Sequence, residues 1–346
     1  MPTLCYGWDV GGAHLKFAVV DGAGRLLDVR ELACPLWEGP SVLPAAVTAL
    51  AAEFGLRDGR HAITMTGELC DAFATRAEGV STILDMLDVA LGGTRLVYGA
   101  NGWQTPAAAR AHVDEVASMN WHATATFVAA ALGDGCLVDI GSTTSDLVPF
   151  VRGQVIAQGR TDASRLERGE LVYTGAVRTP VMAVVSCVPC RGAWRGVAAE
   201  HFATMADIYR VTGELPDGAD LLPTADGRPA DLVHSLRRLA RMLGDDARPE
   251  DACVLGACAR FIRLRQVERL LDALALIGSR DNAGECTGTL VGAGVGSFIA
   301  ARLAGVQGAH FLDFATLANV PEALAARANA AAPAVALAHM LRELPA

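Results

Sequence analysis

A short pattern that occurs twice constrains this chain more than any other feature. In each copy, apolar residues lead to an aspartate, a glycine turn follows, and a second apolar run begins. The copies span residues 8–17 and 138–147, about 130 residues apart. Each is typical of a strand, a tight turn and a second strand. Glycine lets the backbone approach a phosphate closely, and exposed N–H groups and hydroxyls can bind its oxygens. The repetition therefore indicates an internal duplication with two phosphate-binding hairpins.

The two turns and the aspartates before them supply the candidate binding residues. Asp9 and Asp139 can each hold a hydrated magnesium ion, so Mg²⁺ is the expected cofactor. The candidate diphosphate ligands are Gly11, Gly12, His14, Lys16, Gly141, Ser142, Thr143 and Thr144. The alternative is a pair of ordinary hairpins with Gly and Ser chosen for the turn conformation, in which His14 is a turn residue.

Lys16 is the single lysine of the chain, since every other residue among the 29 Lys and Arg is arginine. This composition indicates a coding bias against lysine that is unrelated to structure. The one lysine lies inside a glycine hairpin, where a flexible ammonium group can follow a phosphate. The planar guanidinium of arginine would not replace it equivalently. Lys16 is therefore a candidate catalytic residue as well as a phosphate ligand.

Composition bounds the remaining possibilities. A chain of 346 residues has room for two domains. A net charge of −9 without a basic run argues against nucleic-acid binding and favours small-molecule substrates. No signal peptide or membrane span is expected, and nine scattered cysteines indicate reduced thiols, so a cytoplasmic location follows. A homo-oligomer remains open.

The order of apolar patterns predicts an α/β fold in which the second half repeats the first. Residues 1–118 are expected to form one lobe. Residues 119–346 are expected to form the second, with an irregular insert at about 160–250 and a closing C-terminal helix that packs back on the first lobe. The expected strands are 4–10, 15–20, 27–32, 61–66, 95–98, 136–140, 147–151 and 154–158, and residues 287–296 are expected to form a strand and then a glycine turn. The expected helices are 41–54, 80–91, 123–132, 198–210, 231–243, 250–276, 297–303 and 322–344.

Two halves that each open with three strands around an Asp-Gly hairpin resemble the actin/sugar-kinase/heat-shock-chaperone superfamily. A late glycine turn with Gly292, Gly294 and Gly296 adds to this likeness. The resemblance implies two ribonuclease-H-like domains around a central cleft, with adenine held beside the late turn in many members. The spacing of that turn does not fit a dinucleotide fingerprint, because Ser297 follows where glycine or alanine is required.

Several longer segments are more specific. They are together similar to hydantoinase/oxoprolinase-like proteins of tetrahydromethanopterin-linked one-carbon pathways, and they are residues 66–69, 120–121, 139–146, 169–175, 178–180 and 199–210. This resemblance implies a transferase of methanofuran or methylofuran biosynthesis. Such an enzyme condenses an aminomethyl-furanmethanol diphosphate with the phenol of a γ-glutamyl-tyramine or tyrosine-derived unit. The products are an aryl ether and pyrophosphate.

This chemistry needs a base for the phenol, whose pKa in water is about 10. The candidates are Glu68, Asp71, Glu170 and Glu200, and Glu68 is preferred because it follows a strand end. Lys16, Glu68 and Asp139 are thus the expected catalytic residues. Each acid alone can also be a helix cap or a solvated surface residue.

The cysteine pair and three tryptophans each allow a functional and a structural interpretation. Cys187 and Cys190, with Glu200 and His201 nearby, can bind zinc, but a single CxxC more often holds two buried thiols. The tryptophans at 103, 121 and 194 can cover a substrate ring or pack in a core. An ATP-dependent small-molecule kinase and a non-catalytic nucleotide-gated sensor are the alternative functions for this fold.

Overall fold

The computed structural model describes residues 4–39, 41–56, 59–281 and 286–345. The chain divides into two compact units. Unit 1 comprises Met1–Gly133, Arg152–Val155 and Asp313–Ala346, and unit 2 comprises Asp134–Val151 and Ile156–Leu312. The C-terminal segment thus belongs to the unit that contains the N-terminus. Residues 120–132, which the sequence analysis placed in the second lobe, also belong to unit 1.

The sheet of unit 1 has the strand order β3-β2-β1-β4-β5-β6. Strands β1, β2 and β3 pair antiparallel, whereas β4 is parallel to both β1 and β5. Alternate residues of β1 face opposite sides, so Tyr6, Trp8 and Val10 enter the core while Asp9 faces the other way. The strands are β1 (Cys5–Val10), β2 (His14–Val20), β3 (Leu26–Ala33), β4 (Arg60–Met65), β5 (Thr94–Gly99) and β6 (Gly102–Gln104).

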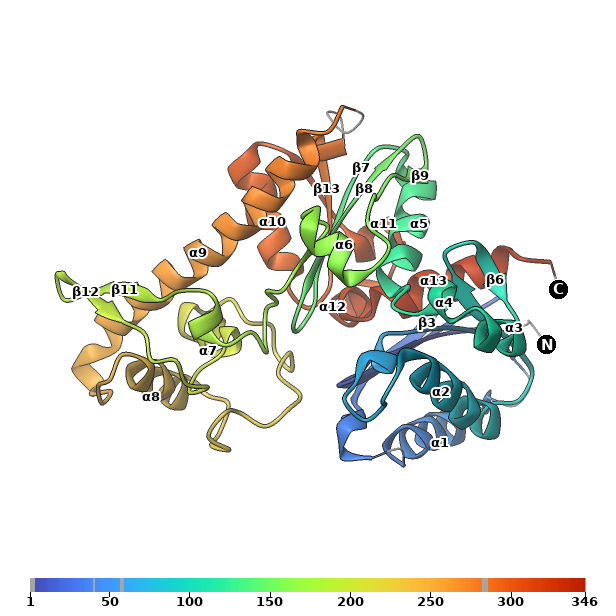
Figure 1. Ribbon diagram of the computed structural model, residues 1–346, viewed down its shortest axis with the longest axis horizontal. Helices are drawn as coiled ribbons and strands as arrows, with labels where there is room; N and C mark the ends of the chain where they lie inside the picture. The colour runs from blue at the N-terminus through green and yellow to red at the C-terminus, as the bar shows by residue number, and fades with distance from the viewer. Residues whose placement is uncertain (1–3, 40, 57–58, 282–285, 346) are drawn as a thin grey trace. The chain divides into compact units, whose positions relative to one another are not determined.

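Helices cover both faces of this sheet. Figure 1 shows α1 and α2 on one side of the blue strands and the red α13 on the other. The helices of unit 1 are α1 (Val42–Phe54), α2 (Arg76–Ala90), α3 (Pro106–Ala111), α4 (Val113–Val116), α5 (Asn120–Leu132), α11 (Phe314–Leu317), α12 (Glu322–Ala330) and α13 (Ala332–Glu343), with 3-10 turns η1 (Leu36–Glu38) and η3 (Gly67–Leu69).

The direction of α13 follows from its contacts. Gly7 in the middle of β1 lies against the backbone of Ala334, so close that a Cβ there would be 1.8 Å from the Ala334 oxygen. Arg60, at the start of β4, donates to the Leu344 carbonyl at 3.1 Å. Helix α13 therefore runs antiparallel to β1 and β4. Its N-terminus lies at the carboxyl end of these strands, which is where Asp9 is found.

Unit 2 repeats this plan with the strand order β10-β8-β7-β13-β14. Strands β7 and β8 form an antiparallel hairpin and β13 is parallel to β7, as β4 is to β1. Its strands are β7 (Gly135–Ile140), β8 (Ser145–Val151), β10 (Leu171–Val172), β13 (Thr289–Ala293) and β14 (His310–Asp313), while β9 (Gln154–Val155) pairs with β8 and β11 (Cys187–Cys190) pairs with β12 (Ala193–Gly196).

The helices of unit 2 enclose its own core, in which Tyr209, Leu239 and Ile262 are buried beside Ile140. They are α6 (Asp162–Glu167), α7 (Met205–Thr212), α8 (Leu232–Met242), α9 (Ala252–Gly278) and α10 (Ser297–Gln307), with 3-10 turns η4 (Val181–Ala183), η5 (Pro249–Asp251) and η6 (Cys286–Gly288). In Figure 1 the long α9 runs from β13 and α10 toward α7, α8 and the β11–β12 hairpin.

Both duplicated hairpins and most expected elements are confirmed within a few residues. The helix expected at 198–210 is wrong in its first half, because α7 begins at Met205. There Thr204 and Asp207 form a reciprocal capping box. The helix expected at 322–344 is instead two helices, α12 and α13, and Pro333 lies in the first turn of the second. The strand expected at 154–158 is limited to Gln154–Val155.

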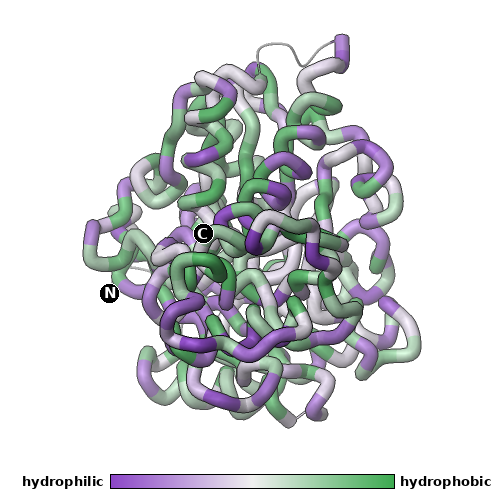
Figure 2. Tube along the Cα trace, turned by 90° about the vertical axis from the view of Figure 1, so that its left-hand side faces the viewer, coloured by the Kyte–Doolittle hydropathy of each residue, from purple (hydrophilic) through white to green (hydrophobic). Residues whose placement is uncertain are grey.

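The hydropathy colouring of Figure 2 alternates between green and purple along the trace, without a long green stretch. Among the described residues, no helix has both the length and the apolar character that crossing a membrane requires.

Candidate functional site

The first hairpin turn has its carbonyl groups fixed by a neighbouring segment. The Gly12 carbonyl accepts from the Leu36 N–H at 2.9 Å, and the Ala13 carbonyl accepts from the Cys34 N–H at 2.8 Å. In a trans peptide the C=O and the following N–H point in opposite directions. The N–H groups of Ala13 and His14 therefore point away from the 34–36 segment. This arrangement of successive N–H groups is typical of an anion-binding turn.

Polar side chains form a row across the sheet of unit 1 beside this turn. Strand register pairs Asp9 with Lys16, Lys16 with Glu31, and Asp9 with Thr64, so all four lie on one face. The Lys16 ammonium is 3.5 Å from Asp9 Oδ2. Thr64 is fully buried, and no described residue pairs with its hydroxyl. The row lies on the face that α13 covers, at the N-terminal end of that helix, where N–H groups and the helix dipole favour negative charge.

His14 and Glu31 extend the row toward the edge of the sheet. His14 Nδ1 lies 3.8 Å from Glu31 Oε1. Burial raises the pKa of Glu31, and the positive charge of Lys16 partly offsets this effect. The hairpin thus combines one permanent cation with acidic groups on both sides of it.

Glu68 lies in η3, directly after β4, and is 2% exposed. The Thr66 N–H donates to the Val10 carbonyl at 3.0 Å, which holds this segment next to the first hairpin. The Ser118 hydroxyl donates to Glu68 Oε1 at 2.8 Å, while Oε2 is buried and has no hydrogen-bond partner among the described residues. Burial raises the pKa of Glu68 to about 7, and the Ser118 hydrogen bond and the Arg76 charge lower it by smaller amounts. A carboxyl group of this kind is suited to general base catalysis near neutral pH.

The other candidate bases have different environments. Glu170 is fully buried but accepts hydrogen bonds from the N–H groups of Gln158 and Gly159 and from Arg280, at 2.6–2.8 Å. These three donors give it a structural role. Asp71 and Glu200 are exposed. Glu68 is therefore the candidate whose environment fits proton transfer.

The second hairpin turn is held in the same way as the first, by the segment 176–179. The Gly141 carbonyl accepts from the Ala176 N–H at 2.9 Å, and the Ser142 carbonyl accepts from the Arg178 N–H at 2.8 Å. The N–H groups that follow these carbonyls, on Ser142 and Thr143, point away from that segment. No described residue accepts a hydrogen bond from either N–H. The Ser142 hydroxyl is likewise buried without a described partner.

Buried residues of unit 2 support this turn from behind. The Thr179 hydroxyl accepts from the Gly175 N–H and donates to the Thr143 carbonyl at 3.3 Å. The Gln266 amide of α9 donates to the Thr174 hydroxyl at 2.6 Å and accepts from the Tyr209 hydroxyl. The specific segments at 169–175 and 199–210 thus contribute to the rigidity of the second hairpin. Arg165, also buried, forms a 2.7 Å ion pair with Asp146 on β8.

The late glycine turn packs on the end of β7. A Cβ at Gly292 would lie 2.7 Å from the Phe311 ring, and one at Gly296 would lie 2.5 Å from the Ile140 side chain. Gly294 has φ +77°, and a Cβ there would lie 2.2 Å from the Ile140 carbonyl and 2.5 Å from Asp139 Oδ1. Close packing in unit 2 therefore gives a structural reason for all three glycines, and the nucleotide interpretation of this turn stays a prediction.

Replacing Gly294 with alanine is expected to lower the free energy of unfolding by about 3 kcal/mol, because strain at positive φ adds to overpacking. Gly305 in α10 is exposed and has open space around its Cα, so Gly305→Ala is the matched control. It should be neutral or stabilising by up to about 1 kcal/mol. Urea unfolding measures both. Equal stability of the two variants would contradict the packing account.

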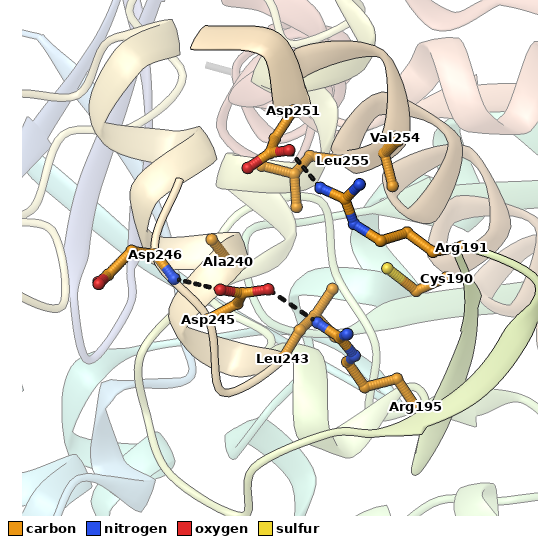
Figure 3. A pocket seen from close by; sticks show the side chains of 10 residues that line it. All are labelled: Cys190, Arg191, Arg195, Ala240, Leu243, Asp245, Asp246, Asp251, Val254 and Leu255. Atoms are coloured by element: carbon orange, nitrogen blue, oxygen red, sulfur yellow. Dashed lines mark hydrogen bonds and ion pairs between the residues drawn. The ribbon is translucent and has the colours of Figure 1, made fainter. Parts of the chain in front are cut away.

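The cysteine pair and the tryptophans lie outside the two hairpins. Cys187 and Cys190 are on the β11–β12 hairpin with opposite faces, since their spacing in a strand is odd. A pocket beside Cys190 is lined by two ion pairs, of Arg191 with Asp251 and of Arg195 with Asp245 (Figure 3). The candidate phosphate, metal and base residues do not line this pocket. Trp103 and Trp194 pack edge-on against Tyr98 and Phe261, and Trp121 is buried.

Each hairpin by itself offers oxygen ligands that suit a hydrated magnesium ion. In unit 1, Asp9 lies next to the last residue of β1 with the buried Thr64 hydroxyl in register. In unit 2, Asp139 lies next to the last residue of β7 and shortly before the buried Ser142 hydroxyl. Mg²⁺ prefers oxygen ligands and is commonly held by one or two carboxylates, substrate phosphates and water. No group of three or more His, Cys, Asp or Glu that could hold a metal occurs among the described residues. A partly hydrated magnesium ion bound at these aspartates therefore stays a prediction.

Two residues near Glu68 and Asp9 were missed by the sequence analysis. Thr64 lies in a predicted strand. Side chains alternate between the two faces of a sheet, so alignment of this strand with the strand of Asp9 would have placed Thr64 on the same face as Asp9. Ser118 has no local signal. It reaches Glu68 only because residue 117 bridges to Met65 at the end of β4.

Comparison with solved structures confirms the expected fold. The chain is similar to the nucleotide-free structure of acetone carboxylase, with a TM-score of 0.57 and 12% identity over 98% of this chain and 70% of that chain. It is also similar to a chain of the PilM–PilN type IV pilus biogenesis complex, with a TM-score of 0.52 and 13% identity over 100% and 99% of the two chains. Together with the repeated strand order, these likenesses show the α/β fold of the actin/sugar-kinase/heat-shock-chaperone superfamily.

Sequence comparison is more specific. A synthase of Methanocaldococcus jannaschii is 33% identical over 248 residues, which cover 71% of this chain and 73% of that protein. A Methanococcus vannielii synthase of the same name is 37% identical over 123 residues, covering 35% and 55%. Both are named for a furan-2-yl methanamine product that carries a phenoxymethyl group with a 2-(gamma-L-glutamylamino)ethyl substituent. Residues 60–343 match the hydantoinase/oxoprolinase family. The chain therefore belongs to the hydantoinase/oxoprolinase family and is a relative of these synthases.

Proposed function

We propose that this protein is an enzyme that forms an aryl ether by transferring a furanylmethyl group from its diphosphate to a phenol. The observation that carries this proposal is the 33% identity over 71% of the chain to a synthase named for a phenoxymethyl-furan product. The phenoxymethyl group contains a bond between a phenol oxygen and a methylene carbon. The proposed substrates are thus an aminomethyl-furanmethanol diphosphate and the phenol of a γ-glutamyl-tyramine or tyrosine-derived unit, as in methanofuran or methylofuran biosynthesis.

The methylene–oxygen bond to the diphosphate breaks, and its electron pair leaves with pyrophosphate. The furan ring stabilises the positive charge that develops on the methylene carbon. The phenol oxygen then bonds to that carbon, and its proton passes to a base. The protein must therefore stabilise negative charge on the leaving group and accept one proton.

The two hairpins supply groups for the first task. In unit 1 the turn N–H groups and Lys16 can bind diphosphate oxygens, and in unit 2 the N–H groups of Ser142 and Thr143 can do the same. Preorganised donors are effective because they do not have to reorient as charge develops. Asp9 and Asp139 are the proposed ligands of Mg²⁺, which would neutralise charge on the departing diphosphate.

Glu68 supplies the base. Its Oε2 atom is the acceptor that remains when Ser118 occupies Oε1. Its pKa of about 7 means that the ionised form is present at neutral pH and still has useful basicity toward a phenol.

One assay tests the proposal against the kinase and the sensor. Purified protein is given furanylmethyl diphosphate with a γ-glutamyl-tyramine phenol in one reaction and ATP with small alcohols, acids or amines in another. We expect pyrophosphate and an aryl ether in the first, dependent on Mg²⁺ and lost with EDTA, and no ADP in the second. ADP without pyrophosphate would establish the kinase, and no product in either reaction would favour the sensor.

A further inference from the structure

Ser118 has a backbone conformation that its side chain does not favour. Its φ is +55°, in the left-handed region that few non-glycine residues adopt. Such strain costs about 1–3 kcal/mol and is often found at functional sites. Ser118 is also 7% exposed, so solvent does not compensate for the strain.

The surrounding contacts fix this conformation. Residue 117 forms a parallel bridge with Met65, which aligns the segment with the end of β4. From this position the Ser118 hydroxyl reaches Glu68 Oε1 at 2.8 Å. On its other side Glu68 is packed so closely against α2 that a Cβ at Gly79 would lie 2.7 Å from the Glu68 Cα. Helix α2 thus fixes the backbone of Glu68 and Ser118 fixes its carboxylate, of which only Oε1 has a described partner.

We propose that Ser118 is a positioning residue that occupies Glu68 Oε1 and thereby presents Oε2 as the single proton acceptor. This proposal rests on the proposed role of Glu68 as the base. A hydroxyl donor stabilises the ionised carboxylate in a site where burial disfavours charge. It also determines which oxygen can accept the proton of the phenol. When the Ser118 hydroxyl is hydrogen-bonded to Oε1, Oε2 is the oxygen that remains available as an acceptor.

Other charged groups around Glu68 enter its titration. Arg76 of α2 lowers the pKa of Glu68, whereas Glu78 of α2 accepts from the Ala74 N–H at 2.9 Å. The other titratable groups of α2, which packs against η3, are Asp85, paired with Arg110, and Asp88, paired with Arg95 and Arg110. Cys70 and Asp71 follow η3 in the chain, and Asp9, His14, Lys16 and Glu115 lie on further elements of unit 1. None of these is changed in the variants below, so a shift in the pH profile reports on the Ser118 hydrogen bond.

The test compares Ser118→Ala with Ser118→Gly. Both remove the hydroxyl donor and keep the Ser118 backbone N–H, but glycine also relieves the strain at positive φ. If Ser118 positions the base, both variants should raise the midpoint of the acid limb of kcat/KM by about one pH unit. The activity near pH 7 should then fall about fivefold and return toward that of the unchanged protein at pH 9. The glycine variant should be the more stable of the two although the shift is the same.

A double variant separates this proposal from the proposed function. In a Glu68→Gln background, Ser118→Ala should have no further effect on kcat/KM, because the two residues act as one unit. An unchanged midpoint in both Ser118 variants, while Glu68→Gln abolishes the acid limb, would overturn the role of Ser118 alone. Full activity of Glu68→Gln would overturn the base assignment itself.

Discussion

Lys16→Ala is expected to lower kcat/KM for the furanylmethyl diphosphate by about a thousandfold, the effect seen when a preorganised donor to a developing anion is lost. Lys16 is the one lysine of the chain and its ammonium lies on the face of the sheet that carries Asp9. If the proposed function is right, removal of this charge takes away a cation that stabilises the departing diphosphate. Steady-state release of pyrophosphate measures the effect. Inhibition by added pyrophosphate should weaken in parallel, because the same group binds the product.

Two further variants make the result specific. Lys16→Arg keeps a positive charge beside Asp9, so it should preserve stability and recover only part of the activity, since a guanidinium does not follow a phosphate as an ammonium does. Arg25 provides the matched control. It pairs with Asp21 at 2.8 Å at the next hairpin of the same sheet, with a highly exposed side chain. Arg25→Ala should leave kcat/KM unchanged. Normal activity of a folded Lys16→Ala protein would remove the phosphate-binding role of the first hairpin.

Much of the fold was predictable because its signals are local. Alternating apolar residues around Asp9 and Asp139, interrupted by glycine, determine both hairpins, and the repeated order of strands indicates the superfamily. The predicted helix boundaries were wrong where the apolar spacing and the capping residues indicated different positions. The mixed polar segment before Met205 has helical spacing, but the capping box at Thr204 begins the helix later. Pro333 ends one helix and begins the next in a run that is otherwise uniform in alanine.

The candidate site was less predictable because its properties depend on tertiary contacts. Glu68, Asp71 and Glu170 are equivalent in sequence terms. They differ in the structure because Glu170 has three donors, Asp71 is in solvent and Glu68 is buried with one donor. Ser118 contributes through the bridge of residue 117 to Met65, which joins positions more than fifty residues apart. The glycines at 292–296 stay ambiguous, since close packing on Phe311 and Ile140 requires the same residues as a nucleotide turn.

Glu68→Gln is expected to lower kcat/KM by about a thousandfold, within the usual range for loss of a general base. For the unchanged protein, kcat/KM should fall as the pH decreases below about 7, because protonated Glu68 cannot accept the phenol proton. The glutamine variant should lack this limb. Asp71→Asn tests the nearest competing acid, which is exposed. It should keep both the rate and the pH profile, and loss of the limb in this variant instead would assign the base to Asp71.

At neutral pH, Glu68→Gln should raise the free energy of unfolding although it lowers activity. Stability therefore gives a readout that is independent of the assay. The pKa of Glu68 is raised from 4.5 to about 7 on folding, so the folded state binds this proton more tightly than the unfolded state. The resulting stability is fully present below pH 4.5 and is lost as the pH rises through 7. This loss amounts to about 3 kcal/mol. Glu68→Gln cannot ionise, so from pH 4.5 to pH 8 its free energy of unfolding should improve relative to the unchanged protein by about that amount. Urea unfolding at the two pH values measures this. A difference independent of pH would mean that Glu68 is not buried as an ionisable group, and its role as a base tuned to neutral pH would fail with it.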